Sequence, residues 1–206
     1  MKISSIQYYF HNYTGKHISQ KKVKKFYLPI IKYINNNNKL LIAGSQGIGK
    51  STLLNIIKMI FKHELKKEIL SINLDNFYYD KEYRIKLAKR IHPLLKTRGV
   101  PGTHNIKQID KTVNSFVKSK YPIKIPIFDK LTDKKLKKNI IIKKKCKILI
   151  LEGWCVGCPP INLKYLHKNI NLLEKNFDKR KEWRNYYNTY LKTEYMKLFK
   201  KFNSII

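Results

Sequence analysis

The stretch that decides the fold is AGSQGIGKST, which runs from Ala43 to Thr52. Its core, GSQGIGKS, fits the pattern G-x-x-x-x-G-K-[ST], in which glycines let backbone N–H groups turn inward around phosphate oxygens. The apolar run KLLIAG (39–44) predicts a buried strand before it, and apolar residues at helical spacing in 50–63 predict a helix after it. A structural glycine turn needs no lysine and serine after its last glycine, so the stretch predicts a phosphate-binding loop.

The predicted loop favours ATP and Mg²⁺ as cofactors. Lys50 can reach the β- and γ-phosphates of a nucleotide, and the Ser51 hydroxyl can ligate Mg²⁺. The chain has no N-K-x-D segment of the kind with which a GTPase reads its base. The residues expected to bind the nucleotide are Gly44, Ser45, Gln46, Gly47, Ile48, Gly49, Lys50, Ser51 and Thr52.

The rest of the chain predicts an α/β fold. Two further apolar runs, EILSINL (68–74) and KILILEG (147–153), predict strands, and helical patterns cover 81–95 and most of 161–201. Strands separated by helices favour a mainly parallel sheet, with NSII (203–206) opening a fourth strand. Residues 96–146 are expected to be rich in loops, and residues 1–38 form an N-terminal extension ahead of one domain, 39–206.

The net charge of +32 raises the hypothesis of a nucleic-acid-binding protein. The chain holds 40 lysines, 18 asparagines and 29 isoleucines but only 5 arginines, and Lys, Asn and Ile all have AT-rich codons. Because sequence readers favour the bidentate contacts of arginine, we expect solvated lysines and no dedicated nucleic-acid partner. The same field attracts anionic substrates. No apolar run approaches the ~20 residues of a membrane span, and no signal-peptide pattern opens the chain, so a cytoplasmic protein without a membrane partner is expected.

Acidic residues follow the second and third predicted strands. Asp75 begins DNFYYD, where a carboxylate could accept the proton of a substrate hydroxyl; a turn or helix cap is the alternative. Glu152 ends the third strand, where an acid could hold the water shell of Mg²⁺.

Two further segments are candidates for holding an anionic substrate. TRGVPGTHN (97–105) combines Arg98 and His104 with glycines and a proline, and PIFDK (126–130) places Asp129 before Lys130. Each of these residues taken alone is more often structural. Cys155 and Cys158 have no second Cys/His pair nearby, so a zinc site is improbable.

Several motifs in order resemble the uridine kinase and phosphoribulokinase group of P-loop kinases: QGIGKST, LDNFYY, PIFD and LEG. RIKLAKRIHPLLKTRGVPGTH and LEGWCVG more narrowly resemble the D-glycerate 3-kinase family, as does the tail after residue 171. The resemblance covers about residues 40–206 and implies transfer of the ATP γ-phosphate to D-glycerate. It implies Lys50 and Asp75 as catalytic residues, Asp75, Tyr78, Arg98, His104 and Asp129 as substrate-binding residues, and Ser51 and Glu152 as metal ligands.

The chain departs from the family pattern at specific places. Asn76 and Asn105 stand where the family has acids, and LTDKKLKKNIIIKKK (131–145) lacks the family's glycine- and arginine-bearing element, which raises the question of whether lysines 130–147 replace it. The family continues beyond the point matching Ile206, so we expect a C-terminally shortened domain without its last strand. Two alternatives stay open: an ATP-binding remnant with little or no activity, and a kinase acting on another hydroxylated metabolite. The oligomeric state leaves no trace in the sequence.

Overall fold

The computed structural model describes residues 1–206 and has a four-stranded parallel sheet at its centre, in the order β2-β5-β1-β6. The strands are β1 (Lys39–Ala43), β2 (Ile69–Asn73), β3 (Ile123–Asp129), β4 (Lys134–Ile142), β5 (Ile148–Gly153) and β6 (Ser204–Ile205). The α-helices are α1 (Ile3–Thr14), α2 (Gln20–Lys22), α3 (Leu28–Asn35), α4 (Lys50–His63), α5 (Lys81–Arg90), α6 (Ile106–Val117), α7 (Leu163–Leu166), α8 (Leu172–Phe177), α9 (Glu182–Tyr190) and α10 (Met196–Phe199). Shorter turns are η1 (Val23–Tyr27), η2 (Leu74–Phe77), η3 (Pro93–Lys96) and η4 (Leu191–Tyr195).

The long strands of the central sheet, β1, β2 and β5, are mostly apolar because both faces of the sheet are buried. Successive residues alternate between faces, so Leu40 packs with the N-terminal helices and α4 while Leu41 packs on the opposite side with α6, η4 and α10. In the same way Ile150 joins the first layer and Leu151 the second. The result is a three-layer α/β fold, and every residue of β5 is buried.

The structure confirms the three predicted strands and the helices at 50–63 and 81–90, the latter ending before His92 and Pro93 as expected. The predicted fourth strand is the two-residue β6, which pairs with the edge of β1. The N-terminal residues are helical and bury Ile6, Val23, Ile31 and Ile34. No helix combines the length and the apolar character needed to cross a membrane.

The expectation of loops in 96–146 was wrong. This segment contains α6 and a two-stranded antiparallel hairpin, β3–β4. β4 is lysine-rich and largely exposed, and it gains its strand conformation by pairing with β3, whose Ile123 and Ile125 reach the core. Because the pairing with β3 stabilises β4, the lysine-rich sequence of β4 does not by itself predict a strand.

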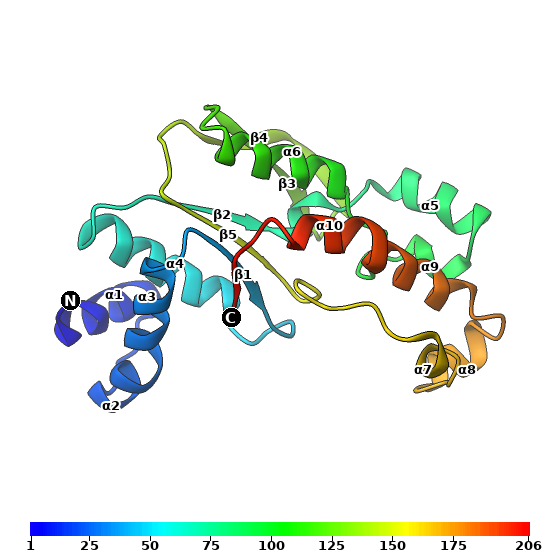
Figure 1. The fold of residues 1–206 in the computed structure, drawn as a ribbon, viewed down its shortest axis with the longest axis horizontal. Helices are drawn as coiled ribbons and strands as arrows, with labels where there is room; N and C mark the ends of the chain where they lie inside the picture. Colours follow the sequence, from blue (N-terminus) through cyan, green and yellow to red (C-terminus); the bar gives the residue numbers. More distant parts are fainter.

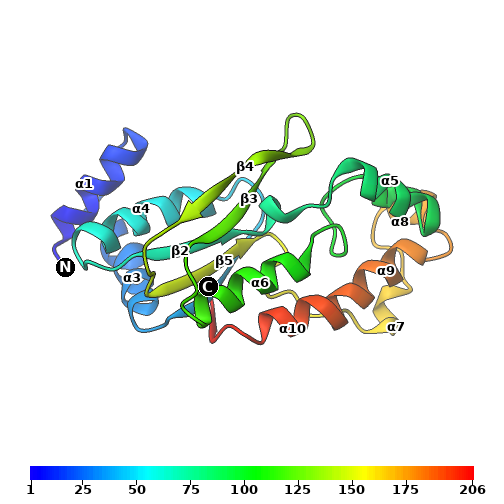
Figure 2. The ribbon, with the colours of Figure 1, turned by 90° about the horizontal axis from the view of Figure 1, so that it is seen from above.

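The molecule is elongated, with α4, α6 and α10 beside the central sheet and further helices at its two ends (Figures 1 and 2). In both views α1 and α3 lie at one end, whereas α5, α7 and α8 lie at the other (Figures 1 and 2). The hairpin β3–β4 lies over the sheet on the side of α6, as Figure 2 shows. This arrangement brings the carboxyl ends of the strands toward the α5 end, where ligands bind in open α/β sheets.

Candidate active site

The loop between β1 and α4 has the backbone of a phosphate cradle. Gly44, Gly47 and Gly49 adopt φ values of 155°, 78° and 95°, which residues with a Cβ rarely adopt. The Lys50 ammonium donates to the carbonyl oxygens of Gly44 and Ser45, each at 2.7 Å, so it lies within the loop. The loop forms one wall of a cavity of about 320 Å³, to which Gly47, Gly49, Lys50, Ser51 and Thr52 all contribute.

Glu152 lies at the end of β5 beside the start of α4. The Ser51 hydroxyl donates to it at 3.3 Å, and the Asn73 side-chain amide donates at 3.1 Å. Burial raises the pKa of Glu152, while these two donors oppose the shift. A serine hydroxyl and a carboxylate at this spot fit Mg²⁺, which usually takes one or two protein oxygens together with water and phosphate oxygens.

Asp75 is linked to Glu152 through the side chain of Asn73, which bonds to both residues. The Asn73 side-chain oxygen accepts a hydrogen bond from the Asp75 backbone N–H at 2.8 Å, which starts η2 and orients the carboxylate. Its Oδ2 accepts from the Lys130 ammonium at 2.6 Å, whereas its Oδ1 is buried and has no protein partner. Both Asp75 and Lys130 line the phosphate cavity and also a second, larger one.

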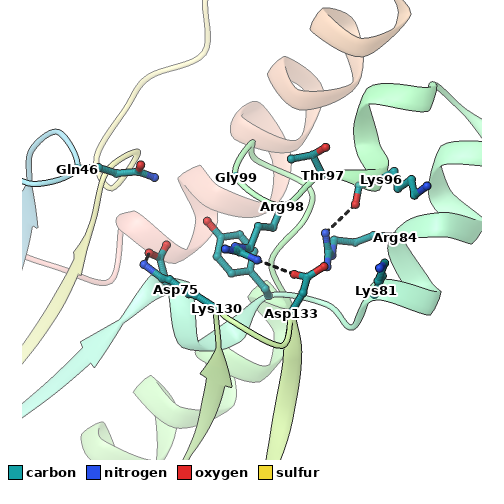
Figure 3. Close-up of a pocket in the computed structure, with 11 residues that line it drawn as sticks. Gln46, Asp75, Lys81, Arg84, Lys96, Thr97, Arg98, Gly99, Lys130 and Asp133 are labelled. Atoms are coloured by element: carbon teal, nitrogen blue, oxygen red, sulfur yellow. Dashed lines mark hydrogen bonds and ion pairs between the residues drawn. The ribbon is translucent and has the colours of Figure 1, made fainter.

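The larger cavity has a volume of about 700 Å³ and is strongly cationic (Figure 3). Its charged lining residues are Asp75, Lys81, Arg84, Lys96, Arg98, Lys130 and Asp133. Five cations face two acids, so the cavity carries an excess of positive charge that suits an anionic ligand.

Asp133 joins two arginines across this cavity. It accepts from Arg98 at 2.8 Å and from the almost fully buried Arg84 at 2.6 Å (Figure 3). Partial burial acts to raise the pKa of Asp133, but the two guanidinium groups lower it below its ordinary value. No sequence motif indicated Asp133, Arg84 or Lys81, because these residues meet only when the hairpin folds beside α5.

Comparisons with known proteins find similarity to proteins named as kinases. No family model matches the chain. An uncharacterised kinase, mug58, of Schizosaccharomyces pombe is 32% identical over 133 residues, which cover 59% of this chain and 47% of that protein. A probable ATP-dependent kinase, TDA10, of Saccharomyces cerevisiae is 33% identical over 135 residues, with the same shares. The chain therefore spans about half the length of these relatives.

The fold comparison points the same way. D-glycerate 3-kinase from Cryptococcus neoformans superposes with a TM-score of 0.69 over 90% of this chain and 71% of that one, at 18% identity. At that identity the superposition establishes the shared fold. The chain is thus similar in sequence to two yeast proteins named as kinases, and it shares its fold with a D-glycerate 3-kinase.

Two residues that the glycerate-kinase-like pattern singled out, Tyr78 and His104, stack on each other beside the cationic cavity. Their rings lie 4.2 Å apart, and a short antiparallel backbone bridge joins them. Burial raises the pKa of Tyr78, and the Asp75 carboxylate adds to this. His104 is fully buried with Nδ1 2.6 Å from the Tyr195 hydroxyl, and burial lowers its pKa to about 3, so the ring is neutral near pH 7. Tyr78 lines the cavity, and His104 supports it from behind.

Asp129, also part of that pattern, lines neither cavity. Its carboxylate accepts from the Leu131 N–H and from the hydroxyl and N–H of Thr132, which closes the turn of the hairpin. The hydrogen bond from the Thr132 hydroxyl is the main cause that lowers the pKa of Asp129. The carboxylate that faces the cavity from this turn is Asp133, four residues later.

Proposed function

We propose that the chain is an ATP-dependent kinase that transfers the γ-phosphate to a hydroxyl of a small acid, with D-glycerate the favoured acceptor. One observation carries the proposal: Asp75 lines both the phosphate cavity and the cationic cavity. A carboxylate at that junction can reach an acceptor hydroxyl on one side while the γ-phosphate lies on the other. The related yeast proteins named as kinases support the activity, and the Cryptococcus enzyme, named as a D-glycerate 3-kinase, suggests the acceptor.

On the nucleotide side, the loop residues 44–52 surround the phosphates. Lys50 leaves the two loop carbonyls that it contacts and turns to the β- and γ-phosphate oxygens. Ser51 and Glu152 would hold Mg²⁺, which when bound would neutralise charge that develops on the phosphate oxygens.

On the acceptor side, Lys130 holds Oδ2 of Asp75, and the unpartnered Oδ1 is the oxygen that accepts the hydroxyl proton. The substrate oxygen attacks phosphorus in line, the new O–P bond forms as the bond to ADP breaks, and the proton passes to Asp75. Arg98, Lys81 and Lys96 bind the acid group of the acceptor.

The test is a coupled assay of ADP release with D-glycerate, pantothenate or uridine as acceptor. We expect acceptor-dependent turnover that is highest with D-glycerate. Mg-ATP binding with no acceptor-dependent ADP release from folded protein would reject kinase activity and favour the ATP-binding remnant. Turnover with pantothenate or uridine alone would keep the kinase and replace its acceptor.

We further propose that the protein works in the cytoplasm without a dedicated nucleic-acid partner. The positive charge of the cationic cavity can attract a small anionic substrate. The lysines of β4 lie on an exposed strand, where water can solvate them.

A further inference from the structure

A third cavity, beside the phosphate loop, differs in chemistry from the cationic cavity. It has a volume of about 470 Å³, and its apolar lining comes from Leu94, Val100, Trp154, Leu173 and Trp183. Trp154 and Trp183 are the only two tryptophans in the chain. Trp154 lies in the loop that follows β5, and Trp183 lies in α9. Ligand sites commonly have volumes of about 300 to 1,000 Å³ and aromatic walls.

The apolar cavity adjoins the cationic cavity and shares lining residues with it. Both are lined by Gln46 and by residues 97–99, so the strand of chain that carries Arg98 forms their common wall. Gln46 also lines the phosphate cavity, which places it where all three meet. A ligand held by Arg98 on one side therefore has an apolar space within its reach.

The walls of the apolar cavity are held in place by buried polar contacts. The Trp154 indole N–H donates to the Gly99 carbonyl at 3.1 Å, which fixes the ring against the common wall. Across the cavity, His92 Nε2 donates to the Phe177 carbonyl at 2.9 Å and thereby ties the start of η3 to the end of α8. The buried Arg184 bonds to Asp178 at 2.9 Å and anchors α8 to α9. The cavity is thus formed before any ligand arrives, which lowers the entropy lost on binding.

We propose that this cavity is the outer part of the acceptor site and takes an apolar or aromatic group of the acceptor. The inference rests on the proposed function, because it places the hydroxyl and acid groups in the cationic cavity. The acceptor class then extends from D-glycerate to hydroxy acids that carry an apolar substituent, which buries its surface against Trp154, Trp183 and Leu173. D-glycerate has no such substituent and leaves this space to water.

The test compares two probes, lactate and 3-phenyllactate of the same enantiomer, by isothermal titration. Both have one hydroxyl and one carboxylate, and they differ only by a phenyl ring. We expect 3-phenyllactate to bind at least about tenfold more tightly, since burial of a ring in a formed pocket exceeds the ~1.4 kcal/mol that a tenfold change requires.

Two matched variants locate the effect. Leu173 lines the cavity and is 42% exposed, so L173K should fold and should bring the ratio of the two dissociation constants close to one. Leu172 is its neighbour on α8, is 72% exposed and does not line the cavity, so L172K should keep the wild-type ratio.

Three outcomes would overturn the inference: equal affinity of the wild-type chain for the two acids, including no binding of either; the same ratio in L173K as in the wild type; or weaker Mg-ATP binding in L173K, which would assign the cavity to the nucleotide. Failure of the proposed function looks different. In that case 3-phenyllactate binds in a Leu173-dependent way, but no acceptor releases ADP.

Discussion

At the scale of single residues, the site depends on the position of Asp75, which is set by its hydrogen bonds to Asn73 and Lys130. The Asn73 side chain bonds to both the Asp75 backbone and Glu152, so one amide sets the positions of two acids on neighbouring strands. A carboxylate that already lies at the junction of two cavities needs little reorganisation when substrates bind.

Replacement of this carboxylate should separate binding from chemistry. We expect D75N to lower kcat by about 10²- to 10⁴-fold, because the amide cannot accept the hydroxyl proton, and to change Mg-ATP affinity little. Steady-state kinetics and nucleotide titration measure the two effects. E82Q, at an exposed position on α5, is the matched control. Equal loss of kcat in both variants, or wild-type kcat in D75N, would contradict the role of Asp75.

His104 gives a prediction about pH. Its pKa falls from 6.5 to about 3 on folding, so below pH 6.5 the unfolded chain binds a proton that the folded chain does not. The stability that neutral His104 contributes is therefore present above pH 6.5 and is lost as pH falls, by up to about 1.4 kcal/mol per pH unit. We expect the free energy of unfolding of H104N, measured by urea denaturation from pH 7.5 to 5, to fall less steeply than that of the wild type. Parallel curves would show that position 104 does not titrate in this way.

At the scale of secondary-structure elements, the hairpin β3–β4 builds one side of the cationic cavity. Its turn supplies Lys130 to Asp75 and Asp133 to the two arginines. Three ion pairs from the four-residue turn 130–133 connect the hairpin to η2, α5 and the 97–99 segment, so the cavity exists only while the hairpin is docked.

Loss of the Asp133 charge should loosen this docking. We expect D133N to lower the free energy of unfolding by about 1 to 3 kcal/mol, because Arg84 is buried and loses its only carboxylate. The KM for the acceptor should rise as Arg98 loses its anchor, while the KM for ATP changes less. K137A, on the exposed part of β4, is the control. Equal changes in the KM for ATP and for the acceptor would argue against a local effect on the cationic cavity.

At the scale of the whole molecule, the net charge of +32 surrounds the proposed small-molecule site. Because the lysines are spread over the surface, we expect their attraction to DNA to be non-specific and steeply dependent on salt. A 20-base-pair duplex should bind with a dissociation constant no tighter than about 10⁻⁶ M at about 0.15 M salt, as fluorescence anisotropy would measure. Nanomolar binding that depends on the DNA sequence would instead support a nucleic-acid reader.

The phosphate loop, the strands of the sheet and the ends of several helices could be predicted from local sequence. The glycines and Lys50-Ser51 of the loop, the continuous apolar strands and the helix breaks at His92-Pro93 are patterns over a few neighbouring residues, and local sterics and burial of apolar surface determine them. The parallel order of the sheet followed because helices separate its strands. These local patterns are enough to predict that Asp75 and Glu152 lie at the same edge of the sheet.

Tertiary structure alone decided the acceptor side. β4 is a strand because β3 pairs with it, not because of its own lysine-rich sequence. Asp133 meets Arg84 across 49 residues, and Trp154 meets Trp183 around an apolar cavity, through packing of elements far apart in the chain. Such contacts leave no local periodicity, because their free energy comes from burial and charge pairing that exist only once the elements are docked. The sequence by itself therefore determined the phosphate loop and the sheet, and the folded chain determined what can lie next to them.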